Sequence, residues 1–167
     1  KIFILSIVIL LLFTSSLFAQ NRNEASVHHG ISDKSMWHTV KIANQLVTQK
    51  SYYNAVENYH KVLDSLPDNE YLLFKIAHAY YKGRDYRNAE KYFLELVVNH
   101  KETKFGMAWF ELAETFKYNG KYEAAQKAFS KFRRGKARTE SEIKLAKKWA
   151  KNGIKTTKIS PLGSRKY

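Results

Sequence analysis

The feature that most constrains this chain is one sequence pattern that occurs three times, at a period of about 34 residues. Each copy is centred on an alanine, and Ala55, Ala89 and Ala125 are 34 and 36 residues apart. The fourth residue after each alanine is aromatic, in the order Tyr59, Phe93 and Phe129. A single unit of this length cannot bury its own apolar face, so a fixed period predicts an array of stacked units.

Within each copy the apolar residues recur every three or four positions, which predicts two amphipathic helices. The turns between these helices are expected at residues 49–51, 83–85 and 119–121. A second small residue stands twelve positions before each central alanine: Ala43, Ala77 and Ala113. Small side chains at both positions let two antiparallel helices approach closely. The sequence therefore predicts an all-α chain of three helical hairpins, with a non-repetitive helical bundle as the alternative.

These three copies resemble the tetratricopeptide repeat family over residues 36–139. In the phase of that family the repeats are 36–69, 70–103 and 106–139, and two extra residues, Lys104 and Phe105, precede the third. The proline that ends the motif is present only as Pro67 in the first repeat. The resemblance implies a right-handed superhelix of three hairpins, with a concave groove lined mainly by the first helix of each repeat.

Residues 140–153 have the pattern of one further amphipathic helix, which would cap the last hairpin of the array. Asn152 and Gly153 are expected to end it. Residues 154–167 are predicted to form a basic tail, and residues 156–167 show no helical pattern.

The family resemblance places one set of residues of each first helix in the groove. The partner-binding groove is expected to comprise Trp37, Val40, Asn44, Val47, Tyr71, Phe74, His78, Tyr81, Met107, Phe110, Glu114 and Lys117. This mostly neutral, aromatic set suits apolar anchors or an amphipathic helix of another protein or peptide segment. The alternative is that some of these rings, Phe74 and Phe110 above all, pack between repeats.

Some relatives grip a partner's C-terminal carboxylates with lysines and an asparagine. Asn44 fits one of those positions, but Val40 stands where the first lysine is required, so no such clamp is expected. We interpret His78 as a satisfied or solvent-facing histidine rather than a pH-sensitive contact.

Positive charge is concentrated at the C-terminal end. The formal net charge is +14, and residues 131–167 contain 13 basic and 2 acidic residues. A pI near 9.8 suggests nucleic-acid binding, but we do not expect it of an exported chain. The alternative function to groove binding is contact with an anionic surface, such as lipid headgroups, cell-wall polymer or an acidic protein, through Lys144, Lys147, Lys148 and Lys151. A basic cap that merely keeps the array soluble would have the same composition.

The N-terminal residues predict export. Eleven of the twelve residues at 2–13 are strongly apolar, and the following polar step ends at Ala19. This order is typical of a signal peptide over residues 1–19, cleaved after Ala19, with an uncleaved membrane anchor as the alternative. Residues 20–35 are polar and are expected to form a flexible leader. The predicted location is the periplasm or the inner face of an outer membrane.

Catalytic and cofactor chemistry is not expected. The chain has no cysteine, no glycine-rich phosphate loop, no nucleophile elbow and no zinc-protease motif. His28 and His29 lack a third ligand at suitable spacing and are predicted to be solvent-exposed rather than metal-binding. Glu111 and Glu114 are interpreted as a solvated helix edge. We therefore expect no enzyme activity, no cofactor, no metal and no small-molecule substrate.

Three short runs add a narrower resemblance: residues 18–20, the Ala-Lys-Lys at 146–148, and residues 159–164. Together with the repeats they are similar to the start of OmpA-family envelope proteins of Bacteroidota, which are associated with type IX secretion and gliding. The missing initiator methionine agrees with a piece of a longer chain. This resemblance implies a protein-docking arm in an envelope complex.

Overall fold

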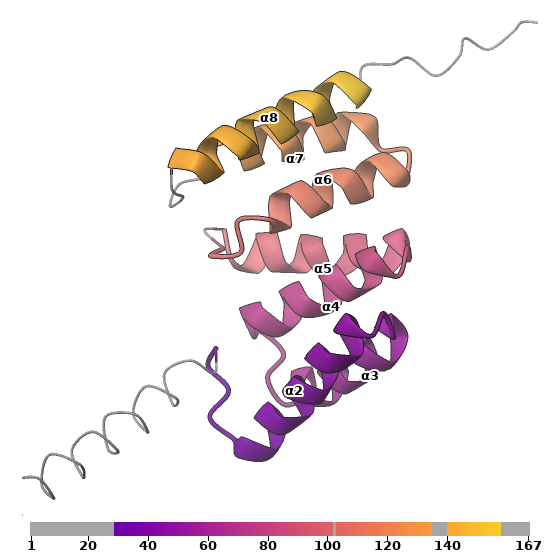
Figure 1. Cartoon of the computed structure of the whole chain (residues 1–167), viewed down its shortest axis with the longest axis vertical. Coiled ribbons are helices and arrows are strands. Elements are labelled where there is room, and N and C mark those ends of the chain that lie inside the picture. The colour runs from indigo at the N-terminus through magenta and orange to yellow at the C-terminus, as the bar shows by residue number, and fades with distance from the viewer. Residues whose placement is uncertain (1–28, 102, 135–139, 158–167) are drawn as a thin grey trace, which may run out of the picture.

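The computed structural model describes residues 29–101, 103–134 and 140–157, and within these ranges every regular secondary-structure element is an α-helix. Its helices in chain order are α2 (Lys34–Thr48), α3 (Tyr52–Leu63), α4 (Glu70–Lys82), α5 (Tyr86–Asn99), α6 (Ala108–Tyr118), α7 (Tyr122–Arg134) and α8 (Glu140–Thr157). This confirms the predicted all-α repeat array (Figure 1).

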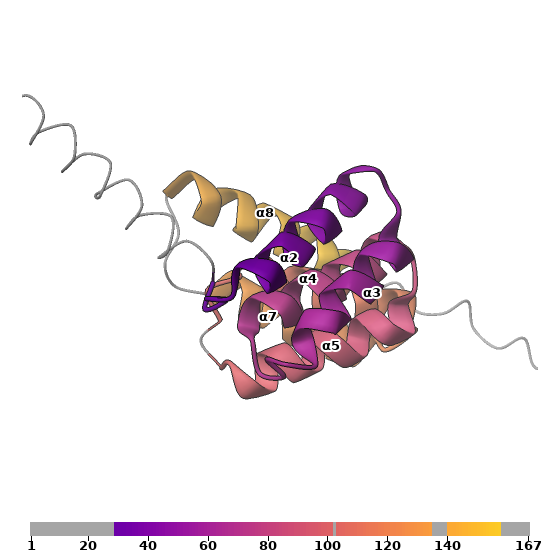
Figure 2. The ribbon, with the colours of Figure 1, turned by 90° about the horizontal axis from the view of Figure 1, so that it is seen from below.

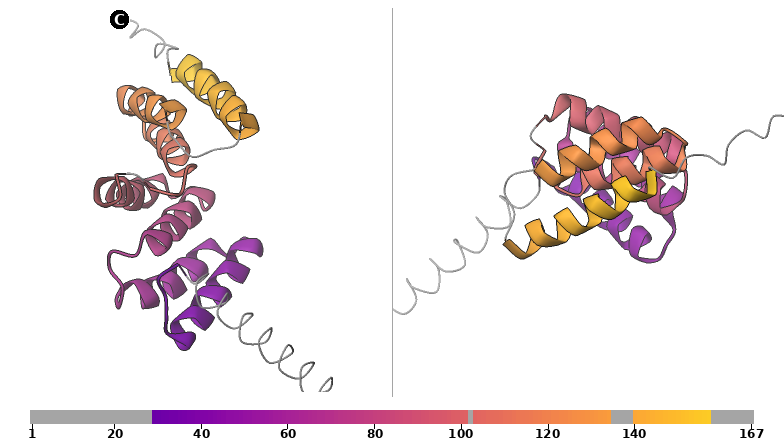
Figure 3. Two further views of the ribbon diagram at one scale, coloured as in Figure 1. Left: turned by 90° about the vertical axis from the view of Figure 1, so that its left-hand side faces the viewer. Right: turned by 90° about the horizontal axis from the view of Figure 1, so that it is seen from above.

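The helices pair as three antiparallel hairpins, α2–α3, α4–α5 and α6–α7, and α8 packs against α7. Each hairpin also packs on the next along the chain, which produces the elongated stack of Figure 1. Figures 2 and 3 show that α2, α4, α6 and α8 share one side of this stack and the second helices share the other. We call the side formed by α2, α4, α6 and α8 the inner face.

The repeated small and aromatic residues form the core, as the period predicts. All six alanines are fully buried: Ala43, Ala55, Ala77, Ala89, Ala113 and Ala125. The three aromatic residues Tyr59, Phe93 and Phe129 are also fully buried. A larger side chain in place of one of these alanines would cost about 1–3 kcal/mol through overpacking.

Three of the described helices, α2, α4 and α5, have their N-terminus capped by a side chain. Asp33 accepts a hydrogen bond from the backbone N–H of Met36 at 2.8 Å, and Asn69 accepts one from that of Leu72 at 3.1 Å. Asp85 does the same for α5. Each cap satisfies a helix N–H group that has no partner within its own helix.

The turns inside the hairpins fall where the sequence predicts them. Each turn holds one residue in the left-handed backbone region: Lys50 at φ 62°, Arg84 at φ 63° and Gly120 at φ 74°. Only the third turn has glycine at this position, and glycine is the residue that adopts this backbone region without steric cost.

The end of the predicted leader differs from expectation. Ile31 is 1% exposed and belongs to the core, and α2 begins at Lys34. The ring of His29 stacks on that of Tyr71 with centroids 4.0 Å apart, and His29 is only partly exposed instead of lying freely in solvent. Residues 20–28 of the leader, His28 among them, and the predicted signal peptide lie outside the described residues.

The predicted end of the capping helix was wrong. Asn152 and Gly153 do not end α8, which continues to Thr157. Gly153 is buried, and a Cβ atom added to it would lie 2.3–2.6 Å from the ring atoms of Phe129. Glycine therefore serves here to let α8 approach α7. Residues 158–167 of the predicted tail lie outside the described residues.

None of the described helices is long and apolar enough to cross a membrane.

Candidate functional site

The inner face carries the twelve residues predicted to line the groove. These residues differ in their exposure to solvent. Val40 is fully buried and Tyr71 is only 7% exposed, so neither offers an open contact surface and their prediction as groove residues was wrong. The other ten are partly exposed: Trp37, Asn44, Val47, Phe74, His78, Tyr81, Met107, Phe110, Glu114 and Lys117.

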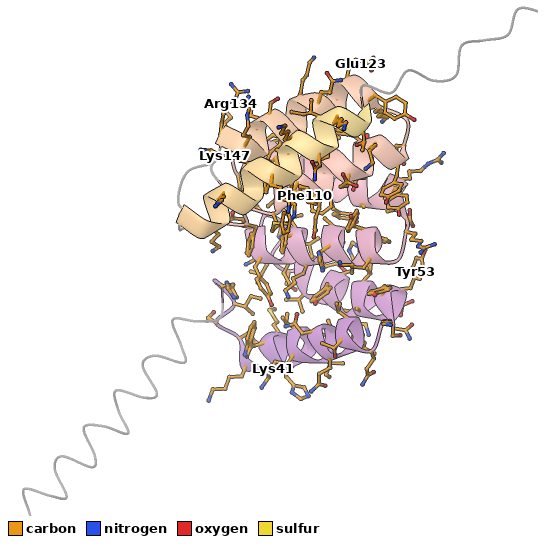
Figure 4. All side chains as sticks on the ribbon, turned by 45° about the horizontal axis from the view of Figure 1, so that its top comes forward. Lys41, Tyr53, Phe110, Glu123, Arg134 and Lys147 are labelled. Carbon is orange, nitrogen blue, oxygen red and sulfur yellow. The ribbon has the colours of Figure 1, made fainter. Side chains whose placement is uncertain are left out.

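The ring of Phe110 packs mainly against side chains of the neighbouring helices α7 and α8. Its ring centroid lies 5.7 Å from that of Phe129, 5.3 Å from that of Phe132 and 5.4 Å from that of Trp149. Figure 4 shows Phe110 beside α8, which carries Trp149. This is the packing alternative that the sequence left open for Phe110.

An aromatic cluster lies where α4 begins. Phe105 stacks on Phe74, with ring centroids 4.6 Å apart and planes 3° apart, and it also contacts Tyr71. Trp37 reaches Tyr71 from α2 at 6.3 Å. Phe105 is one of the two extra residues before the third repeat, so that insertion supplies a ring to this face. The sequence reasoning identified the insertion but not its contact.

Asn44 joins the first two hairpins through hydrogen bonds. Its side-chain oxygen accepts from the hydroxyl of Tyr59 at 2.7 Å, and its amide donates to the hydroxyl of Tyr71 at 3.1 Å. Burial, and secondarily the neighbouring Tyr71, raises the pKa of Tyr59, which therefore remains a hydrogen-bond donor at neutral pH. The side chain of Asn44 is thus engaged in hydrogen bonds within the chain, and contact with a partner protein would compete with them.

His78 of α4 is paired with Glu111 of α6. The Nδ1 atom of His78 lies 2.8 Å and 3.0 Å from the two carboxylate oxygens of Glu111. This confirms His78 as a satisfied histidine. Glu111 is only 7% exposed, so its interpretation as part of a solvated edge was wrong.

The α6 end of the inner face also holds an ion pair and the half-buried side chain of Tyr81. Lys117 lies 2.8 Å from a carboxylate oxygen of Glu114. Burial, and then the charges of Glu114 and Glu111, raises the pKa of Tyr81. The inner face is therefore aromatic near the start of α4 and polar near Tyr81.

Lys75 is a functional candidate that the sequence reasoning missed. It is half-buried on α4, and its ammonium lies 5.3 Å from the ring centroid of Tyr71. Burial lowers the pKa of Lys75, and no carboxylate pairs with it among the described residues. The sequence offered one indication of this role, namely that Lys75 directly follows the predicted groove residue Phe74.

The predicted basic residues Lys144, Lys147, Lys148 and Lys151 are all exposed on α8. Two of them, Lys147 and Lys151, meet Arg133 and Arg134 of α7 around one pocket. The described residues include no group of three or more histidine, cysteine or acidic side chains that could hold a metal ion.

Comparison with known proteins identifies the repeat. Residues 71–103 match the tetratricopeptide repeat family, in the frame of the predicted second repeat. No curated protein sequence matches the chain.

Two solved structures show the same fold. The first repeat domain of Spaghetti (RPAP3), solved with the HSP90 peptide SRMEEVD, is 19% identical with a TM-score of 0.61, and the match covers 78% of this chain and 94% of that one. The repeat domain of Sgt2 from Aspergillus fumigatus is 21% identical with a TM-score of 0.59, and the match covers 75% of this chain and 78% of that one. The second hairpin is therefore a tetratricopeptide repeat, and the described chain has the fold of the tetratricopeptide repeat proteins.

Proposed function

We propose that this chain is an exported scaffold that binds a segment of another protein through its inner face, as part of a bacterial envelope complex. Tetratricopeptide repeat domains generally mediate protein–protein interaction, and one structural neighbour was solved with a bound peptide. The single observation that carries the proposal is the row of partly exposed rings on the inner face, including Trp37, Phe74 and Tyr81.

The chemistry of the inner face supports a peptide-like partner. Half-buried aromatic rings provide contact area at a low cost in side-chain entropy, and such anchors carry most of the energy in protein interfaces. Lys75 offers a cation beside them, which a carboxylate of the partner would neutralise. An amphipathic segment with apolar side chains and an acidic group fits this combination.

Replacing Trp37 and Tyr81 together with alanine is expected to weaken peptide binding at least tenfold, because about 1–2 kcal/mol or more is lost for each buried aromatic anchor. The measurement is fluorescence anisotropy with peptides selected on the wild-type chain from a random phage-displayed library.

The matched control is Tyr53→Ala with Tyr122→Ala, which removes two exposed tyrosines of α3 and α7, on the other side of the stack. This control is expected to bind the peptides as the wild type does. Equal binding by all three proteins, with helicity unchanged by circular dichroism, would exclude the inner face as the binding site.

Export is supported by the sequence alone. The apolar run at residues 2–13, followed by Ala19, and the short runs similar to OmpA-family envelope proteins point to the periplasm or the inner face of an outer membrane.

Fusing alkaline phosphatase after Tyr167 and expressing the fusion in a Gram-negative host is expected to give phosphatase activity, because that enzyme becomes active only after export. N-terminal sequencing of the exported fusion is expected to begin at Gln20. An inactive fusion retained in the cytoplasm would contradict export. An active fusion with an uncleaved N-terminus would establish the membrane-anchor alternative.

A further inference from the structure

We propose that Arg133, Arg134, Lys147 and Lys151 form a binding site for the phosphate groups of an anionic phospholipid surface. The site lies at the end of the stack that α7 and α8 form, and it is separate from the inner-face residues of the proposed function. Figure 4 shows Arg134 and Lys147 close together at this end.

The site is a pocket between two helices. Arg133 and Arg134 come from the last turn of α7, Lys147 and Lys151 from the middle of α8, and Ile154 completes the lining. The Nε atom of Arg134 donates to the backbone oxygen of Ser130 at 3.2 Å, which holds that side chain along its own helix. The two helices thus bring four cations to one concavity with an apolar side chain among them.

These four cations have no compensating charge among the described side chains. All four are exposed, and none of them makes an ion pair with a described acidic residue. Cations held this close repel one another, so a bound anion would lower the free energy of the arrangement. Guanidinium groups match phosphate oxygens in pairs, and lysine ammonium groups act as point charges beside them.

The charge extends from the pocket along α8, and this extension favours a surface over a small soluble anion. Lys144, Lys148 and Lys155 are also exposed, so with Lys151 they form a row at intervals of three or four residues. At the rise of an α-helix this row is about 17 Å long. One phosphate would engage only the pocket, whereas a sheet of phospholipid headgroups engages the whole row. Each basic residue near such a surface contributes about 1 kcal/mol of attraction.

Binding of the full chain to vesicles tests this site. Sedimentation with vesicles of phosphatidylcholine containing phosphatidylglycerol is compared with sedimentation with phosphatidylcholine alone. The neutral vesicles measure any contribution of the apolar residues 2–13, and the difference between the two measures attraction by charge. We expect the double variant Lys147→Glu/Lys151→Glu to lose this difference, with affinity at least tenfold weaker than that of the wild type.

The matched control is Lys41→Glu/Lys61→Glu, which changes net charge equally at two exposed lysines of α2 and α3 without a described ion pair. Lys41 lies at the opposite end of the stack from Lys147 (Figure 4). The control is expected to bind anionic vesicles as the wild type does. Equal loss in both double variants would overturn the proposal, because net charge alone would then explain the binding.

Soluble competitors distinguish the source of the anion. Glycerol 3-phosphate and polyglutamate are added to the vesicle mixture at matched negative charge, and neither is expected to displace the protein. Displacement by glycerol 3-phosphate would show a site for soluble phosphates instead of a membrane. Displacement by polyglutamate would assign the pocket to an acidic protein. Either result would overturn the proposal, and neither affects the peptide-binding test of the inner face.

Discussion

Replacing Phe129 with alanine is expected to lower the free energy of unfolding by about 3–5 kcal/mol, the range for emptying the volume of a buried phenylalanine. The ring is fully buried between three helices: it belongs to α7, contacts Phe110 of α6 and lies against the backbone of α8 at Gly153. Urea unfolding followed by circular dichroism measures the change. A loss below about 1 kcal/mol would mean that the last hairpin and α8 do not pack as described.

A second substitution shows whether this ring requires a glycine on α8. Gly153→Ala alone is expected to destabilise by about 1–3 kcal/mol through overpacking, although alanine is the better helix former by about 1 kcal/mol. In the Phe129→Ala background the same change is expected to stabilise, because the methyl group enters the space that the ring leaves. The exposed neighbour Asn152 provides the control, since Asn152→Ala adds helix propensity without contact. Destabilisation of equal size in both backgrounds would contradict a direct contact.

The sequence predicted the features that repeat. The alanines at 43, 55, 77, 89, 113 and 125 are buried, and the turns inside the hairpins lie where the sequence predicts them. A period is informative here because each unit contacts chiefly the next one, so the same local constraint recurs at each repeat.

The features that do not repeat could not be predicted in this way. Phe105 is an insertion and His29 precedes the array, so no copy elsewhere in the chain shows where their rings lie. Gly153 was misinterpreted because a glycine near a helix end usually stops the helix. Its close approach to Phe129 depends on the angle at which α8 crosses α7, and the residues of α8 alone do not specify that angle.

Burial on the inner face was predicted only in part. The repeat assigns a residue to one side of its helix, but whether a neighbour covers it depends on the side chains of the adjacent repeat. Val40 and Tyr71 are buried, whereas Trp37 and Tyr81 remain partly exposed. Glu111 was assigned to solvent because acidic residues are rarely buried, and its partner His78 is 33 residues away in the sequence.

Replacing His78 with leucine is expected to cost about 3 kcal/mol, at the lower end of the range for leaving a buried carboxylate without its partner. The hydrogen bonds described for the carboxylate of Glu111 come from His78, and that carboxylate belongs to a residue that is 7% exposed. Without the imidazole, a buried charge has no described partner. The cost is at the lower end because the side chain of His78 is 25% exposed, so water can enter the space that it leaves.

Substitution of the other partner, Glu111, distinguishes the cost of a buried carboxylate without a partner from the cost of altered packing. Glu111→Leu is expected to cost only about 1 kcal/mol, because the imidazole that remains can reach water and form other hydrogen bonds. The double variant His78→Leu/Glu111→Leu is expected to be close to the wild type in unfolding free energy, since apolar residues of similar volume often replace a buried pair without loss. Urea unfolding of the four proteins completes the cycle. Strictly additive losses would show that the two side chains contribute independently, and the pair would then not couple α4 to α6.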